Sequence, residues 1–267
     1  MNNPKVTIIT ATYNLIKNNR KDYFIQALES VHNQSYENIE HLIIDGASND
    51  GTVELLEEYS KKGWIKYISE PDKGIYDAFN KGIMKATGKY IAFLNSDDYY
   101  NNINAVKLSV KKLEKTKSAF SFAVATVIKE DGSIYSVFKP MPKTVWSKHP
   151  FCHQTMFTLT DVLKKEGMFN LKYKSAADYD FIIRLFIKDY KWCEMKQNIV
   201  TFRLGSESNI NRKQSILDCL NIYKDTYTKY MSISDLQCKD IIMLNVIPFK
   251  LLYALGVKNP LIYLRYF

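Results

Sequence analysis

The chain has 267 residues, of which 46% are hydrophobic and 24% are charged. This composition is typical of a folded globular protein and excludes a disordered chain, and the length is enough for one sizeable core with a small appendage. No apolar run of about twenty residues occurs, so we expect no membrane-spanning helix.

The cysteines and the first residues indicate the compartment. The four cysteines are widely scattered and form no CxxC pair, which argues against a zinc site and indicates a reducing, cytoplasmic setting. Residues 1–5 lack the basic and apolar regions of a signal peptide. We therefore expect a cytoplasmic protein.

The net charge of +9 is unevenly distributed. Residues 1–100 hold 11 Lys/Arg and 14 Asp/Glu, a net of −3, whereas residues 101–267 hold 26 and 14, a net of +12. The basic second part would attract an anion, and nucleic acid, an anionic membrane surface and a pyrophosphate-bearing substrate all fit. An ordinary lysine-rich solvated face fits equally well.

The first hundred residues alternate between apolar runs and helical periodicity. These patterns predict strands at residues 6–11, 41–44, 65–69 and 90–94, and helices at residues 22–32, 52–62 and 76–86. Such alternation predicts an α/β fold with a mostly parallel central sheet flanked by helices.

Polar residues follow each of the four predicted strands. They are residues 12–14, Asp45, residues 70–72 and residues 95–98. Ligands of parallel α/β sheets bind beyond the carboxyl ends of the strands. We therefore expect a ligand site at this edge of the sheet.

Two common nucleotide motifs are absent. Residues 11–15, after the first strand, contain no glycine, which excludes a dinucleotide-binding GxGxxG turn. Residues 82–90 resemble a phosphate-binding loop, but five residues separate the glycines where four are needed, and Tyr90 replaces the Ser/Thr. Gly88 is more simply a helix stop.

The cluster Asn95-Ser96-Asp97-Asp98 follows an apolar strand. Buried carboxylates are costly unless a cation or a hydrogen-bond network offsets their charge, and Mg²⁺ and Mn²⁺ prefer such oxygen ligands together with substrate phosphates. A cap on the following helix is the structural alternative for both aspartates.

Three segments together carry a resemblance to a known family. The order and spacing of these segments resemble those of the family 2 glycosyltransferases. The segments are residues 6–14, 43–52 and 93–98. The stretch Gly74-Ile75-Tyr76-Asp77-Ala78-Phe79-Asn80-Lys81-Gly82, between the last two, belongs to the same resemblance. The resemblance covers roughly the first hundred residues closely. It implies a GT-A fold, with a Rossmann-like nucleotide-sugar half, an acceptor half and C-terminal helices.

The resemblance also implies roles for individual residues. Asp97 matches the metal ligand, for Mn²⁺ or Mg²⁺, and Asn95 stands where the family's motif begins with an aspartate. Asp45 would accept a hydrogen bond from the nucleobase, with uracil expected, and could equally form an Asx turn. The remaining substrate-binding residues implied in this half are Ala11, Thr12, Tyr13, Lys73, Asn80, Ser96 and Asp98.

Inverting transfer needs a base that takes the proton of the acceptor hydroxyl. Asp178 and Asp180 precede the apolar helical pattern that begins at Phe181, so a helix cap and an Asp180–Arg184 ion pair would explain them structurally. The resemblance implies that Asp178 is the base, although Ala177 stands where a glutamate is common. Asp180 and Arg184 would then support it.

Other candidates lie in the second half. His153 and Gln154, in an apolar segment predicted as a strand, would contact the acceptor or the donor sugar, although a lone histidine is often a satisfied core residue. Residues 202–208 resemble the family's late loop, from which Arg203 would reach phosphate oxygens, as would Arg212 beyond it.

The predicted organisation has a GT-A catalytic domain at residues 1–210, divided into a nucleotide-sugar half (1–100) and an acceptor half (101–210). Residues 211–267 form a C-terminal helical segment whose apolar stretch from Ile241 fits helices lying on a membrane surface. Packing on the core or at a homodimer interface is the alternative.

The sequence therefore predicts a metal-dependent inverting glycosyltransferase of bacterial surface polysaccharide synthesis. It would take a sugar from a nucleotide diphosphate donor and act on a lipid-linked glycan acceptor, in the cytoplasm or on the inner face of the plasma membrane. The alternatives are a nucleotidyltransferase and a basic nucleic-acid-binding module. The former would normally carry a glycine-rich basic loop after the first strand, and we expect no nucleic-acid partner.

Overall fold

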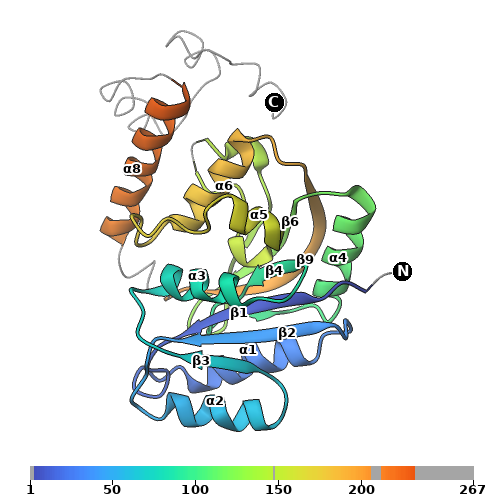
Figure 1. Cartoon of the computed structure of the whole chain (residues 1–267), viewed down its shortest axis with the longest axis vertical. Coiled ribbons are helices and arrows are strands. Elements are labelled where there is room, and N and C mark those ends of the chain that lie inside the picture. Colours follow the sequence, from blue (N-terminus) through green and yellow to red (C-terminus); the bar gives the residue numbers. More distant parts are fainter. Residues whose placement is uncertain (1–2, 147, 206–211, 232–267) are drawn as a thin grey trace. The chain divides into compact units, whose positions relative to one another are not determined.

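A computed structural model describes residues 3–146, 148–205 and 212–231. Its strands are β1 (Val6–Thr12), β2 (Ile39–Asp45), β3 (Lys66–Ser69), β4 (Tyr90–Phe93), β5 (Tyr99–Tyr100), β6 (Phe120–Ile128), β7 (Ile134–Phe138), β8 (Phe157–Leu159) and β9 (Trp192–Arg203). Its helices are α1 (Lys21–His32), α2 (Thr52–Lys61), α3 (Ile75–Lys85), α4 (Ala105–Thr116), α5 (Thr160–Lys165), α6 (Ala177–Ile187) and α8 (Arg212–Met231), with short 3₁₀ turns η1 (Pro142–Thr144) and η2 (His153–Thr155). Figure 1 shows the chain, with most of these elements labelled.

The chain divides into two compact units, each built from three stretches. Unit 1 comprises Met1–Pro140, Phe151–Phe169 and Tyr190–Ser206, and unit 2 comprises Met141–Pro150, Asn170–Asp189 and Glu207–Phe267. Every described strand belongs to unit 1, whereas α6 and α8 belong to unit 2.

The described strands form one nine-stranded sheet in the order β3-β2-β1-β4-β8-β6-β9-β5, with β7 paired to β6. The strands β3, β2, β1 and β4 are parallel. Beyond β4 the pairing is mixed, because β8 is antiparallel to both β4 and β6 while β6 and β9 are parallel.

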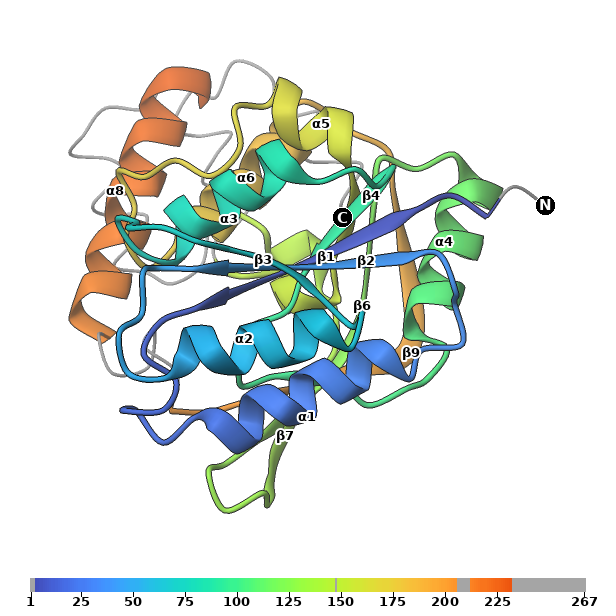
Figure 2. The ribbon, with the colours of Figure 1, turned by 60° about the horizontal axis from the view of Figure 1, so that its bottom comes forward.

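Helices cover both faces of the parallel part (Figure 2). The helices α1 and α2 lie on one face, where Phe24, Leu28 and Leu56 pack with Ile43 of β2. The helix α3 lies on the other face, so close that a Cβ on Gly82 would stand 2.6 Å from the Cγ2 of Ile9. Because both faces are covered, β1 and β2 are buried along almost their whole length.

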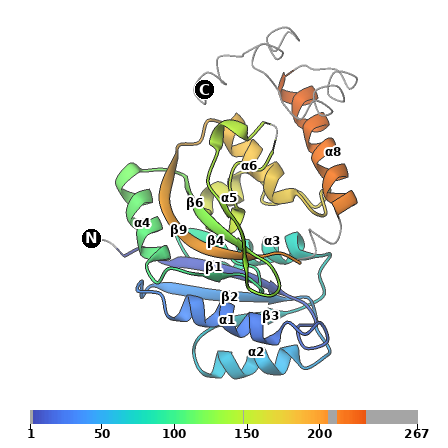
Figure 3. The ribbon, with the colours of Figure 1, turned by 180° about the vertical axis from the view of Figure 1, so that it is seen from behind.

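The second part of the sheet is built on two long strands (Figure 3). The strand β9 has 12 residues and runs parallel to β6, with register shifts along the pair. The helix α4 packs against both strands. This arrangement brings the end of β9 beside the loop that follows β4, because β9 also pairs with the two-residue strand β5.

In unit 2, α8 is bound to the stretch that carries α6. Asp218 accepts a hydrogen bond from the Ser175 backbone N–H at 2.6 Å, and the hydroxyl of Tyr223 lies 3.0 Å from that of Tyr179. No helix within the described residues is both long and apolar enough to cross a bilayer.

The predicted α/β fold class is confirmed, and each predicted element of the first hundred residues is present with boundaries within two residues. Two details in the second half were wrong. The helix predicted to begin at Phe181 begins at Ala177, so Asp178 and Asp180 lie in its first turn instead of before it. His153 lies in the η2 turn and not in a strand, which starts only at Phe157.

Candidate functional site

Thr12 and Asp45 meet at the carboxyl ends of β1 and β2, where they are partners in the parallel register. Both are buried, and the Thr12 hydroxyl donates to Asp45 Oδ1 at 3.0 Å. Asp45 also closes the turn after β2, because the Ser48 N–H, three residues on instead of the two of an Asx turn, donates to Asp45 Oδ2 at 2.9 Å. The turn after β2 is thus held by the same carboxylate that was predicted to contact the nucleobase.

The Asp45 carboxylate has no vacant acceptor position. Besides those two bonds, the Ser48 hydroxyl donates to Oδ1 at 2.6 Å and the Ser69 hydroxyl donates to Oδ2 at 2.7 Å. Two carboxylate oxygens offer about four lone-pair sites in all. A nucleobase N–H could therefore bind Asp45 only by replacing one of these donors.

Tyr13, beside Thr12, is the exposed aromatic of this edge, with 63% of its surface accessible. A Cβ on Gly46 would stand 3.2 Å from the Tyr13 ring and 2.7 Å from Asp72 Oδ2. Glycine at position 46 therefore allows these two side chains to approach the backbone after β2. Burial raises the pKa of Asp72 above its usual range.

The turn that carries Asn95, Asp97 and Asp98 is fixed at both ends. The Leu94 N–H donates to the Ile9 carbonyl of β1 at 3.0 Å, and β5, immediately after the turn, pairs with β9. The Asp98 N–H donates back to the Asn95 carbonyl at 3.2 Å. Both aspartates thus lie in a strand-to-strand turn, and the helix-cap alternative for them was wrong, because α4 begins only at Ala105.

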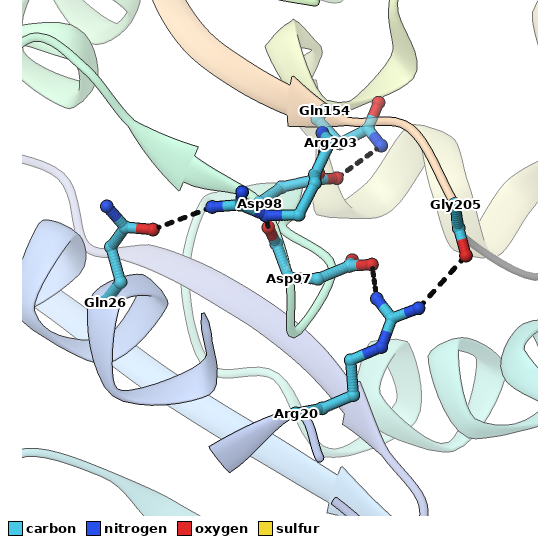
Figure 4. Close-up of polar contacts among 7 residues, drawn as sticks. All are labelled: Arg20, Gln26, Asp97, Asp98, Gln154, Arg203 and Gly205. Carbon is cyan, nitrogen blue, oxygen red and sulfur yellow. Dashed lines mark hydrogen bonds and ion pairs between the residues drawn. The ribbon is translucent and has the colours of Figure 1, made fainter. Parts of the chain in front are cut away.

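Asp97 is buried and paired with an arginine (Figure 4). The Arg20 guanidinium donates to Asp97 Oδ2 at 2.5 Å and, through its other terminal nitrogen, to the Gly205 carbonyl at 3.0 Å. Burial raises the pKa of Asp97, and the positive charges of Arg20 and Arg203 only partly offset that rise.

Asp98 is fully buried and ties three segments together (Figure 4). Its Oδ1 accepts from the Arg203 backbone N–H at 2.8 Å, and its Oδ2 accepts from the Gln154 side-chain amide at 2.8 Å. Burial and the neighbouring charge of Asp97 raise the pKa of Asp98 well above its usual range. Its contacts are those of an anchor that positions the turn.

Arg203, at the end of β9, is the second guanidinium beside Asp97. It is 6% exposed, its centre lies 4.0 Å from the ring centroid of Tyr23, and it donates to the Gln26 side chain at 3.1 Å. Its Nε lies 3.4 Å from the Asp97 carbonyl oxygen. These contacts hold Arg203 in place.

The oxygen atoms of this turn fit a metal ion that is shared with a substrate. The Asn95 Oδ1 atom is buried and accepts no hydrogen bond within the described part of the chain, and Asp97 already binds a cationic group. Mg²⁺ and Mn²⁺ accept one carboxylate and further oxygens from a substrate phosphate. No cluster of three or more His, Cys, Asp or Glu suited to a metal occurs among the described residues.

Asp178 lies in the first turn of α6 in unit 2 and is buried. Its Oδ2 is 3.9 Å from the Nδ1 of His149, a neighbour that the sequence did not indicate. The positive end of the helix dipole favours a carboxylate at this position.

The predicted ion pair between Asp180 and Arg184 is present. Arg184 Nε and one terminal nitrogen lie 2.9 Å and 2.8 Å from Asp180 Oδ2. Burial raises the pKa of Asp180 and the charge of Arg184 opposes this. The pair stiffens the first two turns of α6, next to Asp178.

The other predicted residues differ in their surroundings. Asn80 donates to and accepts from the backbone of Phe169, at 2.8 Å and 2.9 Å, which links α3 to the segment after α5. Lys73 is exposed, whereas Ala11 and Ser96 are half-buried. Gln154 joins the Asp98 network, and its neighbour His153 is half-buried in η2.

Sequence reasoning missed Arg20, Ser48 and Ser69 in unit 1 and His149 in unit 2. Ser48 lies in the dense turn cluster that follows the second strand, so its proximity to Asp45 could have been found from the sequence. Arg20 carried no such signal, since its partner Asp97 is 77 positions away.

The sequence profile described as Glycosyl transferase family 2 matches residues 7–185. The chain belongs to glycosyltransferase family 2. A relative from Bacillus subtilis, named as a putative teichuronic acid biosynthesis glycosyltransferase, TuaG, is 27% identical over 216 residues, which are 79% of this chain and 83% of that protein.

Two solved structures share the fold. The structure of Staphylococcus aureus TarS 1-349 in complex with UDP-GlcNAc has a TM-score of 0.67 at 18% identity, covering 89% of this chain and 70% of that chain. The mannosyltransferase PcManGT from Pyrobaculum calidifontis, in complex with GDP-Man and Mn²⁺, has a TM-score of 0.67 at 16% identity, covering 98% and 73%. The GT-A fold implied by the sequence motifs is thereby confirmed.

Family membership decides among the functions that the sequence left open. The chain is a glycosyltransferase, and the nucleotidyltransferase and the nucleic-acid-binding module were wrong as alternatives.

Proposed function

We propose that this family 2 enzyme transfers a sugar, with inversion, from a nucleotide diphosphate-sugar to a hydroxyl of a glycan acceptor in bacterial surface polysaccharide synthesis. Uridine is the expected base. The observation that carries the proposal is the grouping of Thr12, Asp45 and Asp97 at the carboxyl ends of adjacent strands of unit 1, where α/β sheets bind their ligands.

In the proposed donor site, Ala11, Thr12 and Tyr13 contact the base and ribose. Tyr13 is supported by its exposed ring at this edge. Asp45 accepts the base N–H after the Ser69 or Ser48 hydroxyl moves away, as its filled acceptor sites require. Ser96 and Lys73 complete the proposed contacts to ribose and diphosphate.

We propose that Asp97 and Asn95 hold Mn²⁺ or Mg²⁺ together with the diphosphate. The bound ion would neutralise the charge that develops on the departing nucleotide diphosphate. The complex of PcManGT with GDP-Man and Mn²⁺ supports this proposal by analogy. Asp98, through Gln154 and the Arg203 backbone, positions the turn that carries both ligands.

The proposed reaction uses Asp178 as the general base. Asp178 takes the proton of the acceptor hydroxyl, the hydroxyl oxygen bonds to the anomeric carbon, and the bond from that carbon to the diphosphate oxygen breaks. Attack from the face opposite the leaving group inverts the configuration. Asp180 and Arg184 support the helical turn that carries Asp178, and His153 is proposed to contact a sugar.

The proposed acceptor is lipid-linked, and residues 101–210 are proposed as its half of the catalytic domain. The net charge of +12 over residues 101–267 would favour the anionic inner face of the plasma membrane. The apolar C-terminal stretch proposed to reach that surface, or to form a homodimer contact, lies outside the described residues beyond Met231, as does Ser208 of the late loop.

The donor is tested by thermal unfolding with UDP-, GDP- and TDP-sugars, each with Mn²⁺. A ligand at 100 times its Kd stabilises the folded state by about 2.7 kcal/mol, which raises the Tm by several degrees. We expect the largest shift with a UDP-sugar. A matched variant, Asp97→Asn, should lose the part of the shift that depends on Mn²⁺.

A larger shift with GDP- or TDP-sugars would reject uridine as the base. No shift with any nucleotide-sugar, in a protein that unfolds cooperatively, would reject the donor site itself.

A further inference from the structure

Arg20 stands out because it binds the carboxylate that a metal ion would need. Its guanidinium contacts Asp97 Oδ2 at 2.5 Å, and the Asp97 side chain is only 8% exposed (Figure 4). Since a buried carboxylate needs a counter-charge, Arg20 supplies one for Asp97.

Hydrogen bonds fix the backbone of Arg20, whereas its side chain is partly exposed. Arg20 is the N-cap residue of α1, its N–H donates to the Leu15 carbonyl at 2.8 Å, and its own carbonyl accepts from the Phe24 N–H at 3.0 Å. The side chain is 25% exposed. The guanidinium can therefore change partners by side-chain rotation alone, with α1 left in place.

Arg203, the other guanidinium near Asp97, is held differently. It is 6% exposed and is engaged with the Tyr23 ring and the Gln26 side chain, and its backbone N–H is bound by Asp98. Arg203 contacts the carbonyl of Asp97 and not its carboxylate. Of the two arginines, only Arg20 occupies the oxygen that a metal would bind.

We propose that Arg20 is a displaceable counter-ion, which holds Asp97 until a divalent cation replaces it and which then binds a diphosphate oxygen of the donor. This inference rests on the proposed function, because it assumes that a nucleotide diphosphate binds at Asp97. A guanidinium suits both partners, since its planar fork binds carboxylate and phosphate with the same geometry.

The exchange links metal and nucleotide binding. Without a nucleotide, a cation must compete with Arg20 for Asp97, so Mn²⁺ alone binds weakly. With a nucleotide, the released guanidinium gains a new anionic partner, so Mn²⁺ and UDP favour each other's binding. By linkage, each must raise the affinity for the other by the same factor.

The test is the variant Arg20→Gln, measured with Mn²⁺ alone and with UDP at saturating Mn²⁺. Mn²⁺ affinity, from the free-ion electron paramagnetic resonance signal, should rise about tenfold because a competing charge is gone. UDP affinity, from calorimetry, should fall about ten- to a hundredfold because a charge-assisted hydrogen bond is lost. A merely structural role for Arg20 would weaken both affinities together.

Lys21→Gln is the matched control, because it removes the same charge from the exposed neighbouring residue. It should change both affinities by less than about twofold. Arg20→Lys is the second variant, for use if Arg20→Gln is unstable, because it keeps the positive charge. It should lower UDP affinity less than Arg20→Gln does.

Weaker or unchanged Mn²⁺ binding in Arg20→Gln would overturn the displacement, and unchanged UDP affinity would overturn the diphosphate contact. If Arg20→Lys bound UDP more weakly than a folded Arg20→Gln protein, the proposed diphosphate contact would also be overturned. These failures differ from failure of the proposed function, in which wild-type protein itself would bind no UDP in the presence of Mn²⁺.

Discussion

Asp178 offers a direct test at the scale of a single residue. Asparagine has the same shape but cannot take a proton, so Asp178→Asn should lower kcat by about 10²- to 10⁴-fold, the usual contribution of a general base. UDP affinity with Mn²⁺ should stay within about twofold of wild type. Steady-state transfer assays and calorimetry measure the two quantities.

The matched control for that variant is Asp161→Asn, at an exposed position of α5. It should leave kcat unchanged. Turnover of Asp178→Asn near that of the control would show that another group accepts the proton.

His41 predicts a pH dependence of stability. It is buried in β2, its Nε2 is 3.1 Å from the Thr10 hydroxyl, and burial lowers its pKa from 6.5 to about 3. Below pH 6.5 the unfolded chain binds a proton at His41 that the folded protein refuses until about pH 3. The stability contributed by neutral His41 is therefore complete above pH 6.5 and is lost as the pH falls toward 3.

The measurement compares urea unfolding of wild type and His41→Gln at pH 7 and pH 4.5. Glutamine stays neutral and can keep a hydrogen bond to Thr10. The stability of the variant therefore should not fall through titration at position 41. Relative to the variant, wild type should lose about 2.5 kcal/mol between the two pH values. Equal pH dependence of the two proteins would mean that His41 titrates normally in the folded state.

At the residue scale the sequence predicted where side chains lie in the sheet better than which other side chains they contact. Thr12, Asp45 and Asp97 could be placed at one edge because each follows an apolar strand. The filled acceptor sites of Asp45 and the pairing of Arg20 with Asp97 could not, because they depend on side chains from distant turns. Arg20 follows a loop with no helical or strand periodicity, so nothing local indicated its direction.

Among the elements, α3 gives a prediction in which two effects compete. Replacing Gly82 by alanine inside a helix should stabilise it by about 1 kcal/mol through helix propensity. The new methyl group would, however, stand 2.6 Å from Ile9 Cγ2 and 3.3 Å from Ile44 Cγ1, which belong to two buried strands. Overpacking of this kind costs about 1–3 kcal/mol, so Gly82→Ala should lower the free energy of unfolding.

Chemical denaturation of Gly82→Ala, of Ile9→Ala and of the double variant tests whether overpacking against Ile9 is the cause. The coupling energy between the two substitutions should be favourable, because Ile9→Ala removes the methyl groups in the way. Stabilisation by Gly82→Ala alone would show that α3 can move away from the sheet at little cost.

Element prediction succeeded where burial was uniform. The strands β1, β2 and β4 are almost wholly buried and rich in apolar residues, and α1 to α3 each bury one mainly apolar face. Two later strands carry weaker patterns: β5 has only two residues, and buried and exposed residues alternate irregularly along β9. The early start of α6 was missed since its first turn carries two aspartates, both buried by tertiary contacts.

For the molecule as a whole, α8 tests how unit 2 is held together. Asp225 accepts hydrogen bonds from the Lys172 ammonium at 2.5 Å and the Tyr173 hydroxyl at 2.6 Å. A chain that ends at residue 211 lacks these partners. Trypsin should then cut it at Lys172 and Lys174 faster than it cuts the full chain, because cleavage follows local opening.

Cleavage after Lys61 and Lys62, at the end of α2 in unit 1, is the internal control and should proceed at the same rate in both chains. Unchanged protection of Lys172 and Lys174 in the shorter chain would mean that this stretch is stable without α8. Residues 1–210 would then fold without the C-terminal segment, as the predicted boundary at residue 210 implies.

Unit 2 is built from three separate stretches of the chain, and this affects how the protein can be recombined with related enzymes. Its stretches join unit 1 after residues 140, 150, 169, 189 and 206, so a chimera made with a single crossover inside the chain would combine pieces of two parents within one packed body. Swapping this unit intact requires three coordinated replacements, and libraries designed with paired junctions at those positions should yield more folded hybrids than libraries cut once.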